Sequence, residues 1–326
     1  MGSEVKIVMT GGSGFLGTML ARAFVRRGDE VVVVSRHPGV GGWRSVRWDG
    51  RSLGPWAREF DAADAVINLA GRSVNCRYTS ENRREILDSR VRSTHAVGEA
   101  IIRAARPPRV WLQASTATIY AHRYDAPNDE LTGVIGGNEP DAPSAWRFSI
   151  DVARAWESAL DEAVVGSTRK VAMRTAMVLS PDPGSVFPIL RRHITFGLGG
   201  GGHGDGRQFV SWVHHADFVR AVEWLIAHDD MAGPVNIASP FPLRNAEFMR
   251  ALRREAGLPV GLPAPTWMLE IGAHILRTET ELILKSRRVV PTRLLRSGFT
   301  FRFAHWEDAA RDLCARATRE PSKVAA

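Results

Sequence analysis

The first part of the chain alternates short apolar runs with longer segments of helical periodicity. Residues 5–9 and 30–34 are nearly continuous apolar runs rich in valine, which is typical of buried strands. Residues 15–27 place apolar side chains three and four positions apart, which predicts a helix with one buried face. Strands that alternate with helices predict a parallel sheet.

The same alternation continues toward the middle of the chain. Further strands are predicted at residues 65–69, 109–114 and 170–177, with long helices at about 80–105 and 144–165 between them. Because parallel strands joined by helices cross over in a right-handed sense, we predict an α/β fold, a Rossmann-type doubly wound parallel sheet with a small, mostly helical C-terminal cap.

Glycine and proline divide the second half of the chain. Residues 180–184 (Ser-Pro-Asp-Pro-Gly) break the pattern, and 197–206 hold seven glycines in ten residues, which predicts a loop, either a lid or a plain connector. A helical tail is expected from Trp267 to Arg277 and onward. We therefore predict a dinucleotide-binding domain over 1–240, with a substrate-side insertion at about 180–210, and a cap or substrate domain over 241–326.

Composition narrows the class of protein. The 326 residues are 44% hydrophobic and 24% charged, as in an ordinary globular protein. The net charge of +8 comes from scattered arginines without a nucleic-acid reader motif, so no nucleic-acid partner is predicted. No apolar run approaches the ~20 residues of a membrane span, and no signal-peptide layout is present, so we expect a cytoplasmic protein without a membrane partner. Cys76 and Cys314 have no metal-ligand spacing, and no metal site is predicted.

A glycine motif lies between the first predicted strand and the first predicted helix. It satisfies G-x-G-x-x-G within the run Thr10, Gly11, Gly12, Ser13, Gly14, Phe15, Leu16 and Gly17. Glycines let such a turn reverse tightly and approach a pyrophosphate, and the helix N-terminus presents free N–H groups to the anion. Strand, turn and helix in this order predict a dinucleotide site.

The end of the second strand indicates which dinucleotide binds. Enzymes that use NAD usually carry Asp or Glu there for the ribose 2′-hydroxyl, whereas this chain has Ser35, Arg36 and His37. A guanidinium and a hydroxyl suit a 2′-phosphate by charge and by forked hydrogen bonding. NADP(H) is therefore preferred over NAD(H).

Taken with later motifs, these residues resemble the extended branch of the short-chain dehydrogenase/reductase superfamily. Closest is its atypical subfamily of nucleoside-diphosphate-sugar epimerase-like proteins, which has its own C-terminal domain without an assigned function. The resemblance covers nearly the whole chain and rests on the blocks 66–71 (VINLAG), 113–120 (QASTATIY), 174–180 (RTAMVLS), Gln208 with 211–214 (SWVH), and the C-terminal pattern Pro291, Leu294, Leu295, Gly298, Phe299, Phe301.

The resemblance implies a cofactor lying across the carboxyl edge of the sheet. The residues placed along it would be Asn68, Leu69, Ala70, Gly71 and Ala114. Ser115 or Thr116 would lie near the nicotinamide, with Thr116 in the place of the superfamily's catalytic Ser/Thr, where it would hydrogen-bond a substrate carbonyl. A homodimer through the helices at 80–105 and 144–165 is also implied.

The superfamily's general acid is missing. That acid is the tyrosine of Tyr-x-x-x-Lys, in which the lysine ammonium lowers the phenol pKa. The three tyrosines are Tyr78, Tyr120 and Tyr124, and none is followed by lysine four residues later. In the expected helix, Phe148 with Val152, or Ser149 with Ala153 in the neighbouring register, takes the two places. Any catalysis needs another acid, and the candidates are Tyr120, His122, Asp151, His214 and Asp217.

Two functions remain open at this point. The first is an NADP(H)-dependent oxidoreductase or epimerase that acts on a small carbonyl- or hydroxyl-bearing substrate. The second is an NADP(H)-binding sensor or regulatory protein without turnover. The absence of the Tyr-x-x-x-Lys pair favours the second, whereas the complete cofactor motif and the cap favour the first.

Overall fold

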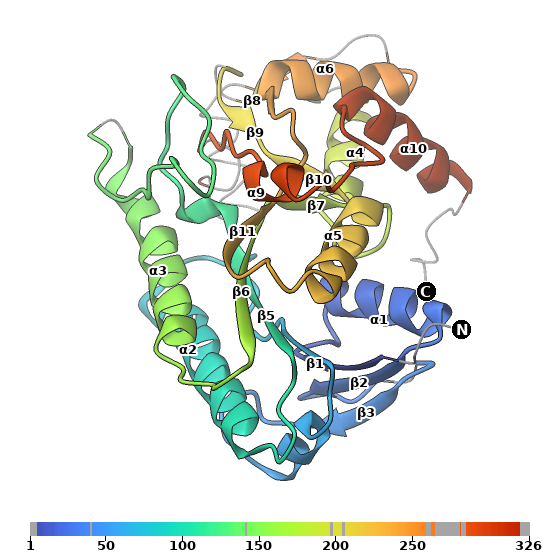
Figure 1. Cartoon of the computed structure of the whole chain (residues 1–326). Helices are drawn as coiled ribbons and strands as arrows, with labels where there is room; N and C mark the ends of the chain where they lie inside the picture. Colours follow the sequence, from blue (N-terminus) through green and yellow to red (C-terminus); the bar gives the residue numbers. More distant parts are fainter. Residues whose placement is uncertain are drawn as a thin grey trace.

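The structure is a computed structural model that describes residues 5–39, 41–140, 142–195, 198–203, 206–258, 262–264, 281 and 285–319. Its centre is a seven-stranded sheet in the order β3-β2-β1-β4-β5-β6-β11, with every neighbouring pair parallel (Figure 1). The strands are β1 (Lys6–Thr10), β2 (Glu30–Ser35), β3 (Arg44–Arg47), β4 (Ala65–Asn68), β5 (Val110–Thr116), β6 (Arg169–Thr175) and β11 (Gly233–Ile237). This is the predicted Rossmann-type sheet.

The strand order reverses between β1 and β4. From β1 the chain builds outward through β2 and β3, then returns to place β4 on the other side of β1. At such a switch point the loops after the two strands diverge, and ligands bind in the crevice outside the carboxyl ends. The carboxyl ends of β1 and β4 are Thr10 and Asn68.

Helices cover both faces of the sheet. Helices α1 (Phe15–Arg27) and α5 (His215–Ala227) pack on one face, and α2 (Ser80–Arg103) and α3 (Arg147–Asp161) lie side by side on the other (Figure 1). Strand alternation produces the two cores: in β1, Ile7 and Met9 join the α1 side, whereas Val8 joins the α2 side. No helix among the described residues combines the length and apolar character needed to cross a membrane.

A second group of elements lies above the carboxyl end of the sheet (Figure 1). Its apolar core includes Trp212, Phe248 and Trp306. The elements are α4 (Phe187–Thr195), α6 (Asn245–Glu255), α9 (Thr292–Arg296) and α10 (Trp306–Arg319), and the strand pairs β7 (Met177–Leu179) with β10 (Trp212–His214), β9 (Phe209–Val210) with β12 (Leu243–Arg244), and β8 (Leu198–His203) with β13 (Leu262–Ala264). Short 3-10 turns follow β5 (Ala117–Ile119) and precede α3 (Ser144–Trp146), and a third, Pro55–Phe60, packs in the core on the α2 side of the main sheet.

The C-terminal part of the chain packs against both groups. Pairing of β9 with β12 crosses residue 240, and Leu294 and Phe299 join the core on the α1 side of the main sheet. The backbone N–H of Asn128 donates to the carbonyl of Arg288 at 2.6 Å, which ties the loop after β5 to the C-terminal segment. The division at residue 240 stays a prediction.

Several sequence expectations differ from the structure in detail. The polar segment β3 lacks an apolar pattern because it is an edge strand, and it was not foreseen. The strand expected at 170–177 divides, because Ala176 N donates to Ile237 O and β7 then pairs with β10. Part of the glycine-rich segment, Leu198–His203, is a strand rather than a loop. The helix expected at 144–165 is α3, which is shorter and runs from Arg147 to Asp161. The helical tail expected at 267–277 lies outside the described residues.

Candidate cofactor and substrate site

The turn after β1 requires glycine at specific positions. Gly11 has a φ of 72°, and a Cβ there would lie 2.5 Å from the backbone nitrogen of Ala70. A Cβ at Gly17 would overlap the Cα of Gly12, so α1 can pack on the turn only without it. At Gly14 the nearest atom to a Cβ would be the Gly11 carbonyl oxygen, at 3.8 Å. Two glycines therefore serve close packing, and the third leaves one side of the turn open.

The N-terminus of α1 is free to bind an anion. Its N-cap is Gly14, which has no side-chain capping hydrogen bond, and the first turn holds no acidic residue. The first backbone hydrogen bond of the helix runs from Thr18 N to Gly14 O at 2.8 Å, so the N–H groups of Phe15 and Leu16 precede the helical ladder. Ser13 and Gly14 are exposed. This arrangement fits a dinucleotide pyrophosphate.

A buried hydrogen-bond chain fixes the carboxyl ends of three neighbouring strands. Thr10 Oγ1 donates to Asn68 Oδ1 at 2.8 Å, and Asn68 Nδ2 donates to Gln113 Oε1 at 2.9 Å. Asn68 Oδ1 also accepts from Ala70 N at 3.1 Å, while Leu69 N donates to Thr10 O at 2.8 Å. Thr10 and Asn68 are fully buried, so their side chains shape the crevice rather than line it.

Ala114 and Gly71, two further residues predicted to contact the cofactor, lie beside this series of hydrogen bonds. Ala114 is half-buried, and its carbonyl oxygen accepts from Gln113 Nε2 at 3.2 Å. Gly71 is exposed and lies against Arg90, whose guanidinium donates to the carbonyl of Arg72 at 3.0 Å. Burial lowers the pKa of Arg90 to about 10. The guanidinium also lies over the ring of Trp156, which fixes α2 against α3 at this edge.

The end of β2 carries the residues predicted to select the dinucleotide. Ser35 is buried and its hydroxyl donates to the carbonyl of His37 at 3.0 Å, so Ser35 shapes the turn. Arg36 is exposed. Strand β3 places Arg47 in register with Ser35, and Arg47 is also exposed. Arg47 was not predicted from the sequence, because β3 carries no apolar pattern. Both arginines therefore belong to the carboxyl ends of two neighbouring strands and are open to solvent.

Thr116 is the half-buried hydroxyl at the carboxyl end of β5. Its Oγ1 accepts a hydrogen bond of 3.1 Å from Thr118 N, and its proton has no acceptor among the described residues. Ser115 differs, because its side chain is buried and donates to Glu157 Oε1 at 2.5 Å. Of the two sequence candidates, Thr116 alone retains a hydroxyl proton for a substrate oxygen.

Ser115 belongs to a buried polar network. Arg174 donates to both carboxylate oxygens of Glu157, at 2.9 and 2.7 Å, and to the Tyr120 hydroxyl at 3.0 Å. Tyr120 in turn donates to Asn236 Oδ1 at 3.0 Å. Burial raises the pKa of Tyr120, which opposes a role in proton exchange near neutral pH. Ser115 and Tyr120 therefore hold β5, β6, β11 and α3 together, and we do not assign them to catalysis.

The positions of the superfamily's tyrosine and lysine lie at the start of α3. The Phe148 ring meets the Tyr78 ring with centroids 5.1 Å apart, and the Arg83 guanidinium lies 4.7 Å from its centroid. Ser149 Oγ donates to Glu281 Oε2 at 2.6 Å. Val152 and Ala153 are buried. Neither register provides a phenol with an ammonium one turn away.

The remaining acid candidates lie apart from the crevice or are already engaged. Asp151 is exposed on α3, where its Oδ2 lies 3.8 Å from Arg147 Nε. Both oxygens of Asp217 accept backbone N–H groups, from Arg302 at 2.8 Å and Phe303 at 2.7 Å. His122 Nδ1 accepts from Ser286 N at 2.8 Å. None of the three offers an unengaged acid at the carboxyl ends of β4 and β5.

His214 is fully buried at the N-terminus of α5. Its Nδ1 accepts from Ala216 N at 3.2 Å, and its Nε2 lies 3.2 Å from Asp312 Oδ2. Desolvation, with a contribution from His215, lowers the pKa of His214 to about 3. The neutral ring therefore caps the helix through Nδ1 and donates from Nε2 to Asp312, so both ring nitrogens are engaged. His214, His215 and Asp312 cluster at metal-ligand spacing, but a metal on Nε2 would require the tautomer that breaks the cap.

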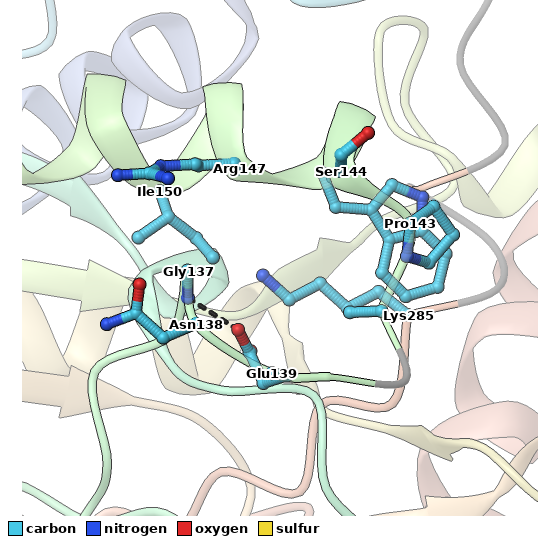
Figure 2. Close-up of a pocket in the computed structure, with 10 residues that line it drawn as sticks. Gly137, Asn138, Glu139, Pro143, Ser144, Arg147, Ile150 and Lys285 are labelled. Carbon is cyan, nitrogen blue, oxygen red and sulfur yellow. Dashed lines mark hydrogen bonds between the residues drawn. The ribbon is translucent and has the colours of Figure 1, made fainter.

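A cavity of about 350 Å³ opens beside the start of α3 (Figure 2). Its walls come from the loop before α3, the first turn of α3 and the C-terminal segment, and they are Gly137, Asn138, Glu139, Ala142, Pro143, Ser144, Trp146, Arg147, Ile150 and Lys285. The amino end of Lys285 points toward the middle of these residues. Lys285 was not predicted from the sequence, because only the fold brings it to this cavity.

Comparisons with known proteins agree with this architecture. A model of the NAD dependent epimerase/dehydratase family matches residues 7–238. The chain belongs to that family. A second model, of a domain of unknown function called DUF1731, matches residues 264–313, a range that includes α9 and the first half of α10. The family resemblance inferred from the motifs is therefore confirmed.

Several relatives of this epimerase-family protein match it over nearly their whole length. The mouse epimerase family protein SDR39U1 is 30% identical over 318 residues, which cover 95% of this chain and all of the relative. The epimerase family protein YfhF of Bacillus subtilis is 29% identical over 95% of this chain and 98% of its own. The crystal structure of human SDR39U1 with NADPH aligns with a TM-score of 0.81 at 28% identity, covering 95% of this chain and 99% of that one.

Proposed function

We propose that this epimerase-family protein is an NADP(H)-dependent oxidoreductase that acts on a small carbonyl- or hydroxyl-bearing substrate. The observation that carries the proposal is the combination, at one sheet edge, of an open helix N-terminus at Gly14 and a hydroxyl at Thr116 with a proton to donate. A bound nicotinamide dinucleotide would supply or accept the hydride, and Thr116 would polarise the substrate oxygen.

The preference for NADP(H) rests on charge. Arg36 and Arg47 are exposed at the carboxyl ends of β2 and β3, and no carboxylate follows β2 within Ser35 to His37. The human relative SDR39U1 was crystallised with NADPH, which supports the same choice. Guanidinium groups bind a phosphate more strongly than a ribose hydroxyl, because the hydrogen bonds are charge-assisted.

Turnover tests the proposal directly. The purified protein is mixed with NADPH and a panel of ketones, aldehydes and nucleotide sugars, and loss of the reduced-nicotinamide absorbance is followed. The proposal expects oxidation of NADPH with at least one panel member. Absence of oxidation with every member, alongside tight NADPH binding, would contradict it.

A second function follows from Phe148 and Ser149, which occupy the place of the superfamily's tyrosine. Without that phenol, the same crevice would serve a protein that binds NADP(H) and reports its redox state to a partner. Tight binding without turnover is the outcome that this second function expects.

A further inference from the structure

Lys285 is a buried lysine that the cofactor site does not use. It lies in the C-terminal segment and is 2% exposed, yet it lines the cavity beside α3 (Figure 2). Its Nζ donates to the carbonyl of Thr118 at 2.9 Å. Thr118 also donates its backbone N–H to Thr116 Oγ1, so the amine and the Thr116 hydroxyl are anchored to the same residue.

A chain of polar contacts connects Lys285 to the place of the missing tyrosine. Its Nζ lies 3.7 Å from Glu281 Oε1, and Glu281 Oε2 accepts the hydroxyl of Ser149 at 2.6 Å. Ser149 occupies one of the two registers in which the superfamily carries its tyrosine. The C-terminal segment thus places the Lys285 amine near the start of α3, where the superfamily's proton-donating tyrosine is absent.

Charged groups of both signs face Lys285. Glu281 on its own segment and Glu139 on the cavity wall favour the ammonium, whereas Arg287 opposes it. Arg147 of α3 also lines the cavity. Burial is the largest influence, and it lowers the pKa of Lys285 to about 8. The carboxylate of Glu139 is engaged by the backbone N–H groups of His122 and Gly137, at 2.7 and 2.5 Å, so it does not take the lysine proton.

We propose that Lys285 is the general acid of the reductase reaction and that the adjacent cavity holds a substrate carrying a ketone or aldehyde. This inference rests on the proposed function. The reductant is a reduced nicotinamide dinucleotide, which supplies a hydride to the carbonyl carbon. The carbonyl π bond breaks, its electron pair moves to oxygen, the Nζ–H bond of Lys285 breaks and an O–H bond forms. The neutral amine then recovers a proton from water.

The cavity offers both apolar and hydrogen-bonding contacts to a small carbonyl compound. Trp146 and Ile150 provide apolar contact, while Asn138 and Ser144 provide hydrogen-bonding groups. An amine with a pKa near the working pH donates a proton efficiently to the oxygen of a carbonyl that is being reduced.

The test combines two measurements: an NMR pH titration of the lysine side chains, which needs no bound substrate, and the pH dependence of the reaction rate. The chain has four lysines, at positions 6, 170, 285 and 323, so protein labelled with ¹³C at lysine Cε gives few NMR signals. One signal is expected to titrate near pH 8 and to disappear in Lys285→Met. The activity of the wild type on its panel substrate is expected to fall as pH rises through the same value, because the protonated amine is consumed.

Two substitutions separate the proton from the charge. Lys285→Met removes both the charge and the proton. Lys285→Arg keeps the charge, but a guanidinium does not release its proton near neutral pH. Each substitution is therefore expected to lower kcat/KM at least about 100-fold and to abolish the pH dependence near pH 8. NADPH affinity should not change in either variant. Lys170→Arg is the matched control, because Lys170 Nζ also donates to backbone carbonyls, of Leu160, Asp161 and Ala163, at the far end of α3.

The outcomes distinguish the two proposals. A wild-type protein that turns over substrate, with a Lys285→Met variant that keeps its rate, overturns the lysine proposal alone. The lysine proposal is also overturned if every lysine signal of the wild type titrates only above pH 10. This outcome is decisive even where the variants fail to fold. A wild type that binds NADPH and reduces no panel member overturns the reductase function and the role of Lys285 with it.

Discussion

Arg174 and Glu157 form a bidentate ion pair in the interior, with N–O distances of 2.9 and 2.7 Å and side chains only 10% and 12% exposed. The pair connects β6 to α3, and it directs Arg174 toward Tyr120 and Glu157 toward Ser115. The carboxylate and its hydrogen bonds raise the pKa of Arg174 despite its burial. The Arg174 guanidinium therefore stays charged in a poorly hydrated place, where the Glu157 carboxylate compensates it.

Replacing Glu157 by glutamine should destabilise the fold strongly. The guanidinium of Arg174 would remain buried without its counter-charge, and breaking such a pair costs about 3–5 kcal/mol. Urea unfolding measures the change. Glu99→Gln is the control, because Glu99 pairs with Arg103 across an exposed turn of α2, and that pair is worth no more than about 0.5 kcal/mol. Equal losses in the two variants would refute the structural role of the buried pair.

Gly11 and Gly28 have similar backbone conformations but different surroundings. Their φ values are 72° and 94°, yet a Cβ would lie 2.5 Å from Ala70 N at Gly11 and would meet nothing within 4 Å at Gly28. Gly28→Ala should cost about 1–2 kcal/mol from its backbone conformation alone. Gly11→Ala should cost more and should also abolish NADPH binding, because the turn must move. Unfolding curves and a nucleotide titration measure both effects, and unaltered binding in Gly11→Ala would count against the proposed turn.

Thr116→Val should separate catalysis from cofactor binding. The valine keeps the shape of the side chain and removes the proton that polarises the substrate oxygen, so kcat/KM is expected to fall by about 100-fold. Thr116→Ser should stay within a few-fold of the wild type, because it keeps the hydroxyl. NADPH affinity should be the same in all three proteins. A valine variant with full activity would show that Thr116 does not contact the reacting oxygen.

Acid should destabilise the protein partly through His214. Its pKa is about 3 in the folded protein and about 6.5 when unfolded, so the unfolded chain binds a proton that the folded one does not. Stability contributed by the neutral ring is complete above pH 6.5 and is lost as pH falls below it. Between pH 7 and pH 5 the wild type should lose at least about 1 kcal/mol more than His214→Asn, which keeps a capping side chain. Parallel losses in the two proteins, measured by urea unfolding, would exclude this origin.

Local sequence signals predicted the glycine turn between β1 and α1. The glycine turn, the strand before it and the helix after it lie within 22 residues, from Lys6 to Arg27, so their geometry follows from short-range rules. The Rossmann order of strands and helices was predicted for the same reason. The family relation, first inferred from motifs, agrees with the match over residues 7–238.

The substrate half was less predictable because it depends on distant residues. Lys285 reaches Thr118 across 167 positions, and no pattern around Lys285 signals that contact. Ser115 and Tyr120 have the residue types of catalytic groups, but hydrogen bonds to Glu157 and Asn236 occupy their hydroxyls. Arg47 was not predicted as a site residue because an edge strand such as β3 needs no alternation of apolar and polar side chains. The homodimer through α2 and α3 stays a prediction.

The selection of NADP(H) by Arg36 is the claim on which the proposed function depends, and a binding titration tests it most directly. NADPH and NADH are titrated against the wild type, Arg36→Ala and the control Arg26→Ala, which changes an arginine in the last turn of α1. We expect the wild type to prefer NADPH, Arg36→Ala to lose about 10- to 100-fold in NADPH affinity with little change for NADH, and Arg26→Ala to behave as the wild type. Equal affinity of the wild type for both nucleotides, or binding of neither, would contradict the account.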